Sequence, residues 1–406
     1  MTLEDQVRDT LDDLAARVPP RTGLADVVLR EARRRRTRVR LVASGGTAVA
    51  VAAGTLFVVA DPLALDRPSL GSADPAADET PPPVAPTPVG TVTIDVATLP
   101  EGPEPDVEWY ANGELRAGGT AVPYDGPQGG VYSIEAVAGG RIALLAVNAE
   151  RTAVELSLVD ATGVRTVLSA DGVGGMAASP DGAYLAWAQP GSGPTTLYVT
   201  DVSSGEVVHE LVRSGADADV GIVKGFLGGD RVLLDSVRSQ SSGVWDLDAG
   251  TVGPWAGPPG TSAVSPDGAL AAAGWEPAVS RGSTSEGSVV IDTATGEQLW
   301  TAEGGYVGPR SFSPDSRFVA FRSTSGRAGV TVADARTGDV QVRFEGVDAS
   351  RVAWEPDGGL VLEVWPSQTS IVVLRCGLDG QCEVAAPLVH MEAIDGSMPY
   401  VLGGVL

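Results

Sequence analysis

Short apolar runs of four or five residues recur after about residue 90, and each follows the same polar turn. Four copies of this turn begin at Ser179, Ser265, Ser313 and Glu355, and each has Pro and Asp in its second and third positions. Proline presets φ at the second position of a turn, and a glycine in the fourth accepts the positive φ that returns the chain. Each copy therefore predicts a strand, a tight turn and a second strand.

Weaker copies of the turn fill the gaps in this series, beginning at Val137, Leu227 and Ile394. The third of them precedes the run Tyr400 to Leu402, which we take as the strand after the seventh turn. The seven turn starts are 38 to 48 residues apart, a period typical of repeat architectures. A further hairpin with Gly or Asx at its tip follows each of the first six turns, whereas the seventh has none.

The missing hairpin is found at the start of the repeat region. Residues Val107 to Arg116 turn at Asn112-Gly113, which is the strongest short hairpin signal. A hairpin donated from the N-terminal side to the last repeat would remove the exposed strand edges of a radial array. The sequence therefore predicts an all-β fold, a seven-bladed β-propeller over residues 91–406.

The turn also carries a family resemblance. Ser-Pro-Asp-Gly followed by an apolar strand resembles the repeat of TolB-type, WD-repeat-like β-propellers, and it covers nearly all of residues 91–406. The Gly-His and Trp-Asp signatures of true WD repeats are missing, and Trp245-Asp246 is an isolated pair. The resemblance implies a scaffold or binding surface and identifies no activity.

A different pattern precedes the repeats. An apolar stripe at helical spacing is formed by Leu3, Val7, Leu11, Leu14 and Val18. Residues 41–60 carry no charge, and as a helix they would extend about 30 Å, enough to cross the bilayer core. Residues 61–90 are rich in Pro, Ala and Asp and predict a disordered, extended linker.

Charge orients the predicted transmembrane helix. Residues 1–40 hold ten arginines and seven acidic residues, and six of those arginines lie between 33 and 40, directly before the span. By the positive-inside rule the N-terminus is cytoplasmic and the propeller lies outside the cytoplasm of a single-pass plasma membrane protein. Two alternatives are a signal peptide cleaved after Ala60 and a buried core helix.

The first 40 residues suggest two further interpretations. The stripe can dock on a cytoplasmic protein, or it can lie on the inner leaflet beside the arginines. An acidic amphipathic helix, a proline break, an Arg run and one span together resemble the cytoplasmic ends of actinobacterial anti-sigma-like membrane proteins. The His and Cys ligands of the zinc-containing anti-sigma family are absent.

Composition excludes several kinds of chemistry. Acidic residues outnumber basic ones by 52 to 28, which disfavours nucleic acid as a partner. The chain has two His and two Cys, too few for a zinc module or most His-based catalysis. His209 and His390 are interpreted as ordinary loop or strand residues, and acidic pairs such as Asp246 and Asp248 as solvated turns. We expect no catalytic residues, no cofactor and no metal.

The two cysteines, Cys376 and Cys382, face each other across the sixth outer hairpin. A disulfide between them is chemically reasonable outside the membrane, and two free thiols are the alternative.

The loops opposite the Pro-Asp turns vary most in length, so a partner is expected on that face, or else the loops are simply long and polar. Trp and Arg are enriched at binding hot spots, and the candidates are Trp275, Arg281, Arg322, Arg327 and Trp365.

The preferred hypothesis is a membrane-anchored, extracytoplasmic propeller that binds a protein or envelope ligand as a scaffold, with a role in envelope sensing. One alternative is an anti-sigma-like regulator that binds a cytoplasmic transcription factor through residues 1–18. The other is a hydrolase or lyase with its active site in the propeller funnel, which would need convergent titratable residues there.

Overall fold

The computed structural model describes residues 88–406 except 112, 118–119, 128–129, 149, 151, 171, 192, 215–219, 237–240, 275–286, 324–327, 391–399 and 404–406. The chain divides into two units, Met1–Thr80 and Pro81–Leu406, and every described residue belongs to the second. The stripe from Leu3 to Val18, the predicted span 41–60 and most of the linker lie outside the described residues. Within the described ranges, no helix is long and apolar enough to cross a membrane.

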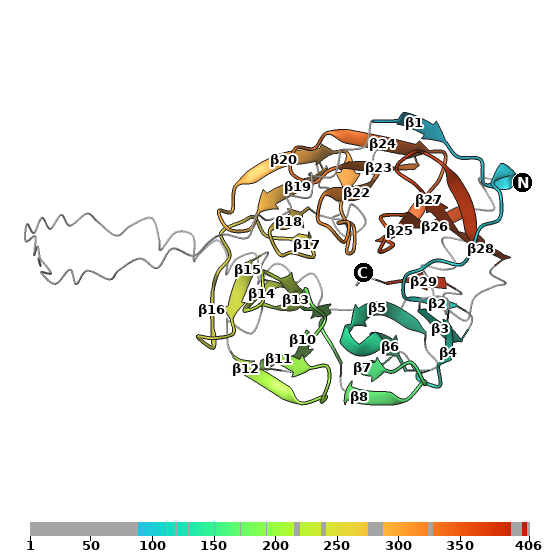
Figure 1. Ribbon diagram of the computed structural model, residues 1–406. Coiled ribbons are helices and arrows are strands. Elements are labelled where there is room, and N and C mark those ends of the chain that lie inside the picture. Colours follow the sequence, from blue (N-terminus) through green and yellow to red (C-terminus); the bar gives the residue numbers. More distant parts are fainter. Residues whose placement is uncertain are drawn as a thin grey trace, which may run out of the picture. The chain divides into compact units, whose positions relative to one another are not determined.

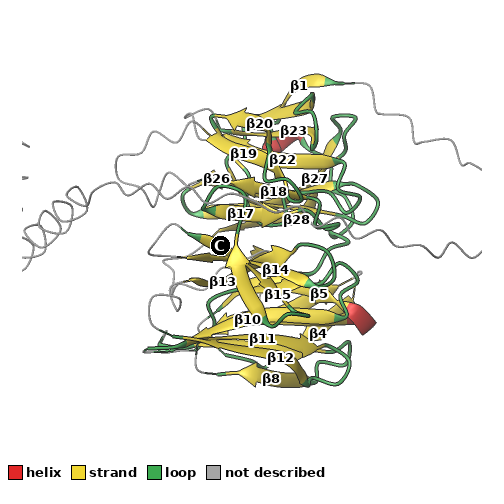
Figure 2. Ribbon diagram, turned by 90° about the vertical axis from the view of Figure 1, so that its left-hand side faces the viewer, coloured by secondary structure: helices red, strands yellow, loops and turns green. Residues whose placement is uncertain are grey.

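The described residues form seven sheets arranged as blades around a central axis (Figure 1), which confirms the predicted seven-bladed β-propeller. Strands account for almost all of the regular structure (Figure 2), with two short 3-10 helices, η1 (Val96–Thr98) and η2 (Ala138–Gly140).

The strands of each blade are given from the innermost outward. Blade 1 contains β5 (Val131–Val137), β6 (Arg141–Val147), β7 (Val154–Val159) and β8 (Arg165–Ser169), and blade 2 contains β9 (Met176–Ala178), β10 (Tyr184–Pro190), β11 (Thr195–Asp201) and β12 (Val207–Arg213). Blade 3 contains β13 (Val220–Phe226), β14 (Arg231–Ser236), β15 (Ser242–Asp246) and β16 (Thr251–Pro254), and blade 4 contains β17 (Thr261–Val264), β18 (Leu270–Ala273), β19 (Gly287–Asp292) and β20 (Gln298–Glu303).

Blade 5 contains β21 (Gly305–Tyr306), β22 (Phe318–Ser323), β23 (Gly329–Asp334) and β24 (Val340–Glu345), with β1 (Gly90–Thr93) outside them. Blade 6 contains β25 (Ala349–Trp354), β26 (Leu360–Ser367), β27 (Ser370–Cys376) and β28 (Cys382–His390). Blade 7 contains β29 (Tyr400–Leu402), β2 (Trp109–Ala111), β3 (Glu114–Ala117) and β4 (Thr120–Pro123).

The second strand of a blade is apolar on both faces because neighbouring blades pack on either side of it. All four residues of β18 are buried, and so are the five central residues of β6. Larger side chains fill the space between blades; Trp245, for example, packs in one cluster with residues of blades 2 and 3.

The Ser-Pro-Asp turns join the first and second strands, as their sequence predicts. Ser179 Oγ donates a hydrogen bond to Asp181 Oδ1 at 2.7 Å and accepts one from the backbone N–H of Tyr184 at 2.9 Å. The turns of blades 4 and 5 repeat both bonds. The fourth position has positive φ even where Ser316 replaces glycine, at 58°. The Ser316 hydroxyl accepts a bond from the backbone of Asp267 in the preceding turn.

The ring closes by pairing the two ends of the propeller in blade 7. Trp109 pairs with Leu402, Tyr110 with Val401 and Ala111 with Tyr400. The expected donation of an N-terminal hairpin to the last blade is therefore confirmed, but the predicted number and order of the strands in that blade were wrong. The N-terminal side supplies three strands, and Tyr400–Leu402 is the innermost strand, which in other blades precedes the turn.

The physical reason is that the first and second strands of blade 7, β29 and β2, come from opposite ends of the propeller region, so no turn joins them. The second strand is then β2 from the other end of the region, and the ladder hydrogen bonds are the same. Ile394-Asp395-Gly396 is consequently not the seventh copy of the turn, and it lies outside the described residues.

Residues before blade 7 form a strap along the outside of blades 5 and 6, which the sequence did not predict. Strand β1 adds to β24 in parallel, and the backbone around Glu101 pairs with Val384 of β28. Arg375 fastens the strap at its end. Its guanidinium donates to both carboxylate oxygens of buried Glu355 at 2.6 Å and to the carbonyl oxygens of Pro103 and Glu104.

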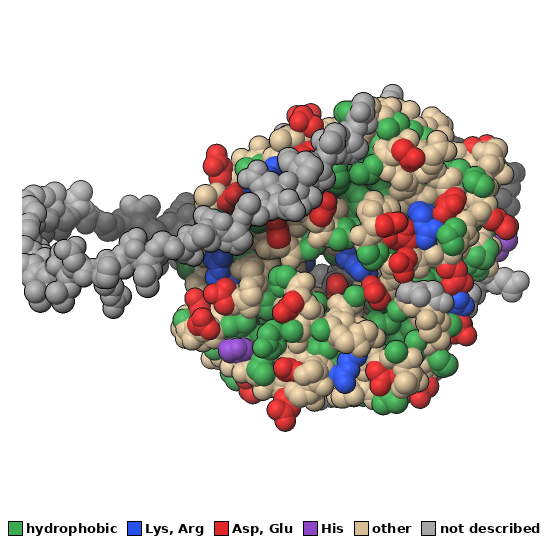
Figure 3. Space-filling model, in the orientation of Figure 1, with side chains coloured by type: hydrophobic (Ala, Val, Ile, Leu, Met, Phe, Trp, Pro, Cys, Tyr) green, Lys and Arg blue, Asp and Glu red, His purple; other side chains and the backbone are tan. Residues whose placement is uncertain are grey.

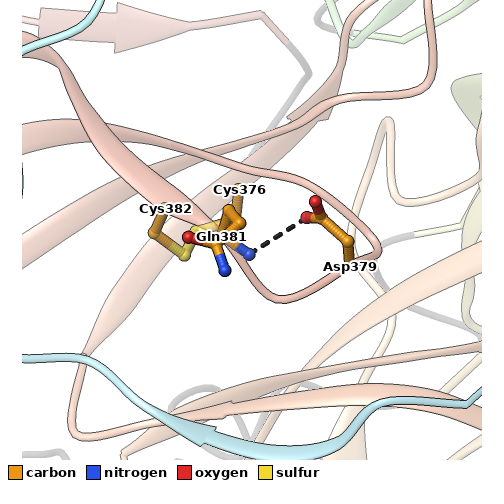
Figure 4. The surroundings of a disulfide bond; sticks show 4 residues. All are labelled: Cys376, Asp379, Gln381 and Cys382. Carbon is orange, nitrogen blue, oxygen red and sulfur yellow. Dashed lines mark hydrogen bonds between the residues drawn. A yellow bond between two sulfur atoms is a disulfide. The ribbon is translucent and has the colours of Figure 1, made fainter.

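Cys376 and Cys382 are joined by a disulfide across the β27–β28 hairpin (Figure 4). At the tip of that hairpin the backbone N–H of Gln381 donates to Asp379 Oδ1 at 3.0 Å. Because only five residues separate the cysteines, the bond restrains this hairpin and not the ring as a whole.

We predict that Trp109→Ala lowers the free energy of unfolding by about 3–5 kcal/mol, because the indole is 3% exposed and packs 5.5 Å from the Tyr400 ring in the closing blade. Urea denaturation followed by circular dichroism measures this. Trp255→Ala is the matched control, since Trp255 is only partly buried in a loop, and it should lower that energy by less than about 1 kcal/mol. Equal losses in the two variants would contradict the closing role of Trp109.

We predict that the Cys376→Ser/Cys382→Ser double variant still folds and that its free energy of unfolding is about 2 kcal/mol lower than that of the wild type. This difference is the loop-closure entropy of so short a bridge. Iodoacetamide applied to the denatured, unreduced wild type should add no mass, and after reduction it should modify two thiols. Labelling without reduction would show that the cysteines are free.

Candidate functional site

Strand direction gives the propeller two different faces. The turns between first and second strands lie at one end of the blades, which we name the turn face. The connections that leave the second strands, such as residues 368–369 between β26 and β27, lie at the opposite end, which we name the loop face. The space enclosed by the innermost strands joins the two faces, and we name it the channel.

Carboxylates of the turn face are occupied by their own turns. Asp181 accepts bonds from the Ser179 hydroxyl and the Ala183 backbone, and the first of these is the main reason that its pKa lies below the ordinary value. Asp201 and Asp292 accept two or more bonds each within their outer turns, and their pKa values are lowered too. These groups build turns and so are poor candidates for a ligand site.

The loop face brings together two of the residues singled out from the sequence. Arg322 on β22 donates to the carbonyl oxygen of Ala349 at 3.3 Å, and its guanidinium lies 5.1 Å from the centre of the Tyr306 ring. Trp365 on β26 donates from Nε1 to the hydroxyl of Ser350 at 2.9 Å. Two different blades thus place an Arg and a Trp against consecutive residues of β25, and both side chains are half-buried.

A buried carboxylate fixes this arrangement. Glu363 is fully buried on β26, where it accepts hydrogen bonds from the Ser350 hydroxyl and, at 3.1 Å, from Arg351 Nη1. It also accepts a longer bond of 3.4 Å from the backbone N–H of Leu402 in the closing strand. The hydroxyl that receives Trp365 is therefore held by the same carboxylate that contacts the ring closure.

An apolar groove of about 700 Å³ lies beside Trp365. Its walls come from blades 5 and 6 and from the strap, and they include Val96, Val347, Pro366 and Leu388. Leu388 is 45% exposed, a high value for so large an apolar side chain. The carboxylates of Asp95 and Asp348 stand in the same lining. The groove and Trp365 together form the Trp365 groove.

Three further sequence candidates, Trp275, Arg281 and Arg327, lie outside the described residues. His209 is on the outermost strand of blade 2 and His390 ends β28. Among the described side chains, no three His, Cys, Asp or Glu residues gather closely enough to hold a metal ion.

The channel holds a cavity of about 390 Å³ whose ionisable residues sequence reasoning missed. A hollow with acidic and basic side chains near it is visible at the centre of the ring in Figure 3. Glu135 of β5, Lys224 of β13 and Arg310, which follows β21, all line the cavity. Burial raises the pKa of Glu135, and the charge of Arg310 opposes that rise.

Each of the two channel cations carried a weak signal in the sequence. Lys224 is the only lysine of the chain, and it stands between apolar residues of an inner strand. Arg310 follows a Gly-Pro pair before the Ser313 turn. Neither signal shows that the side chain points into the channel, because the periodicity of a strand does not reveal where its pairing is interrupted.

No family model matches this chain, and no curated protein matches it. Similar solved structures include the β-propeller domain of Cps50 (Swd1) from Myceliophteria thermophila, with 12% identity, a TM-score of 0.47, and coverage of 65% of this chain and 88% of that one. TolB from Acinetobacter baumannii is 19% identical, with a TM-score of 0.43, and the match covers 64% of this chain and 66% of TolB. Hydrazine synthase from Kuenenia stuttgartiensis is 16% identical, with a TM-score of 0.46, and the match covers 66% of this chain and 88% of that one.

These similarities concern the β-propeller fold, and the proteins differ so widely in what their names describe that no activity follows from them. The β-propeller fold expected from the Ser-Pro-Asp turns is confirmed by the seven sheets of the structure itself.

Proposed function

We propose that this protein is a membrane-anchored binding scaffold, whose propeller lies outside the cytoplasm and holds a protein partner in the Trp365 groove. The observation that carries the proposal is the apolar groove beside Trp365, whose indole is fixed on Ser350 of β25, next to the residue that Arg322 contacts. Aromatic and Arg side chains set into a packed, apolar surface are the residues that dominate protein interfaces.

Two observations support the location. Residues 41–60 are uncharged and follow a cluster of arginines, which favours insertion with the N-terminus inside. The Cys376–Cys382 disulfide fits the same placement, since such bonds persist in oxidising compartments and are rare in the cytosol.

The rigidity of the site supports a binding role. Trp365 donates to the Ser350 hydroxyl, which donates to Glu363, and the pair Arg351–Glu363 is almost fully buried. Side chains that are ordered before a partner arrives lose little conformational entropy on binding, which favours affinity.

The chemistry of the partner follows from the lining. The walls are apolar, but Asp95 and Asp348 stand among them, and the whole chain carries a net charge of −24. A partner segment with an apolar anchor flanked by Lys or Arg would bury its apolar part in the groove and place its charges near the two carboxylates.

We predict that proteinase K added to intact cells cuts the segment 61–87 and releases a propeller fragment into the medium. Immunoblotting with an antibody to the propeller measures this. If the full-length chain survives until the cells are lysed, the propeller lies inside and the location is wrong.

We predict that a photo-crosslinking amino acid at exposed Gln368 captures a partner in intact cells, and that the captured peptide contains Lys or Arg next to an apolar residue. Mass spectrometry identifies that peptide. Trp365→Ala should reduce the product at least about tenfold, because an interface anchor of this kind contributes 2 kcal/mol or more.

Two controls make this result specific. The same amino acid at exposed Arg336 on the turn face should give no such product, and Trp255→Ala should leave the Gln368 product unchanged. Capture that is equal from both faces, or that persists in Trp365→Ala, or that yields an acidic peptide, contradicts binding in the groove.

A further inference from the structure

The channel carries positive charge that the ring itself does not use. Among the described residues, the ammonium of Lys224 has no hydrogen bond or ion pair, although it lines a cavity on the axis. The nearest compensating charge is Asp235, which already accepts bonds from the backbone of Ser236 and the hydroxyl of Ser242. Burial lowers the pKa of Lys224 below its ordinary value, and Asp235 offsets only part of that effect.

Local backbone irregularity delivers Lys224 to the cavity. The pairing of β13 with β14 shifts between Val223 and Gly225, so that Lys224 occupies a β-bulge without a partner residue. The pairing of β17 with β18 shifts in the same way around Ser262, which also lines the cavity. Bulges re-aim side chains and are frequent next to functional sites.

Arg310 reaches the same cavity by a second irregularity. Its φ is +58°, a conformation that is uncommon for a residue with a side chain. Its Nη2 lies 3.4 Å from Glu108 Oε2, whereas its buried Nη1 has no hydrogen-bond partner. A buried donor without a partner is unfavourable unless a ligand or water satisfies it.

The remaining walls define what kind of ligand fits. Met176, Phe226, Phe312 and Trp354 are buried apolar side chains in the lining. Glu135 places a carboxyl group at the cavity and Glu108 already contacts Arg310, so a second negative charge on the ligand would be poorly accommodated. One negative charge on an apolar body matches both the free ammonium and the walls.

We propose that the channel binds a small monocarboxylate with an apolar body, whose carboxylate pairs with Lys224 while Arg310 contributes a second positive charge to the cavity. This site is separate from the Trp365 groove and does not depend on the proposed partner. A charge-assisted bond to Lys224 supplies part of the affinity, and contact of the apolar body with the wall side chains supplies the rest.

Hexanoate is the probe and hexanamide its uncharged counterpart, both titrated calorimetrically into the full-length protein in non-ionic detergent. We expect hexanoate to bind at least about tenfold more tightly than hexanamide. Hexanamide that binds equally well, or inorganic phosphate that binds more tightly than hexanoate, overturns the proposal.

Variants separate a binding role from a structural one. Lys224→Met should weaken hexanoate at least about tenfold and leave the thermal midpoint of the free protein unchanged or higher, since it removes a partly buried charge that makes no ion pair among the described residues. Lys224→Arg should retain binding, and Arg343→Met, which alters an exposed cation on β24, should change nothing. A lower midpoint with unchanged hexanoate affinity in Lys224→Met would make Lys224 structural.

The single lysine offers an independent readout. Reductive methylation with ¹³C-formaldehyde labels Lys224 and the N-terminal amine, and the Lys224 signal is the one that is missing from Lys224→Met. We expect hexanoate to raise the pKa of Lys224, because a bound carboxylate favours the charged form. A Lys224 signal that does not respond to hexanoate contradicts the site.

Discussion

Three pairs of residues, in which β2 meets β29, complete the ring. The innermost strand of blade 7 comes from the far end of the propeller, and only its ladder with Trp109–Ala111 turns an open array of sheets into a closed one. An open array would leave two unpaired blade surfaces, each apolar, together with unsatisfied backbone groups. The closed ring fixes the position of every inner strand; inner strands line the channel, and Ser350 on inner strand β25 receives Trp365.

The two sites use the ring in different ways. At the loop face, the carboxylate of Glu363 joins the closing strand to the hydroxyl that receives Trp365, so the groove is ordered by the closure itself. In the channel, Arg310 crosses to Glu108 beside the closing strand, and Gly403, directly after β29, leaves room for its guanidinium. A rigid frame with local irregularities at its axis is how a repetitive fold can carry a specific site.

What the sequence could predict follows from how local each feature is. The turns depend on residues within six positions of one another, and six of the seven predicted copies join first and second strands; the hairpin at Asn112-Gly113 predicted the remaining blade. The order of the strands in blade 7 could not be predicted, because its first and second strands come from opposite ends of the propeller region and lack the turn that marks them in the other blades. Lys224 and Arg310 were missed because a bulge and a positive φ direct them inward, and neither follows from strand periodicity. Arg322 and Trp365 were chosen by residue type, and their convergence on β25 required the fold.

Hydrogen–deuterium exchange of the backbone amides in β2 and β29 tests the closed ring most directly. The account predicts that amides in Trp109–Ala111 and Tyr400–Leu402 exchange as slowly as those of the buried strand β6, and that both strands open together when the ring unfolds. Rapid exchange in Tyr400–Leu402 while β6 stays protected would show that the last strand is detached, and the account would fail.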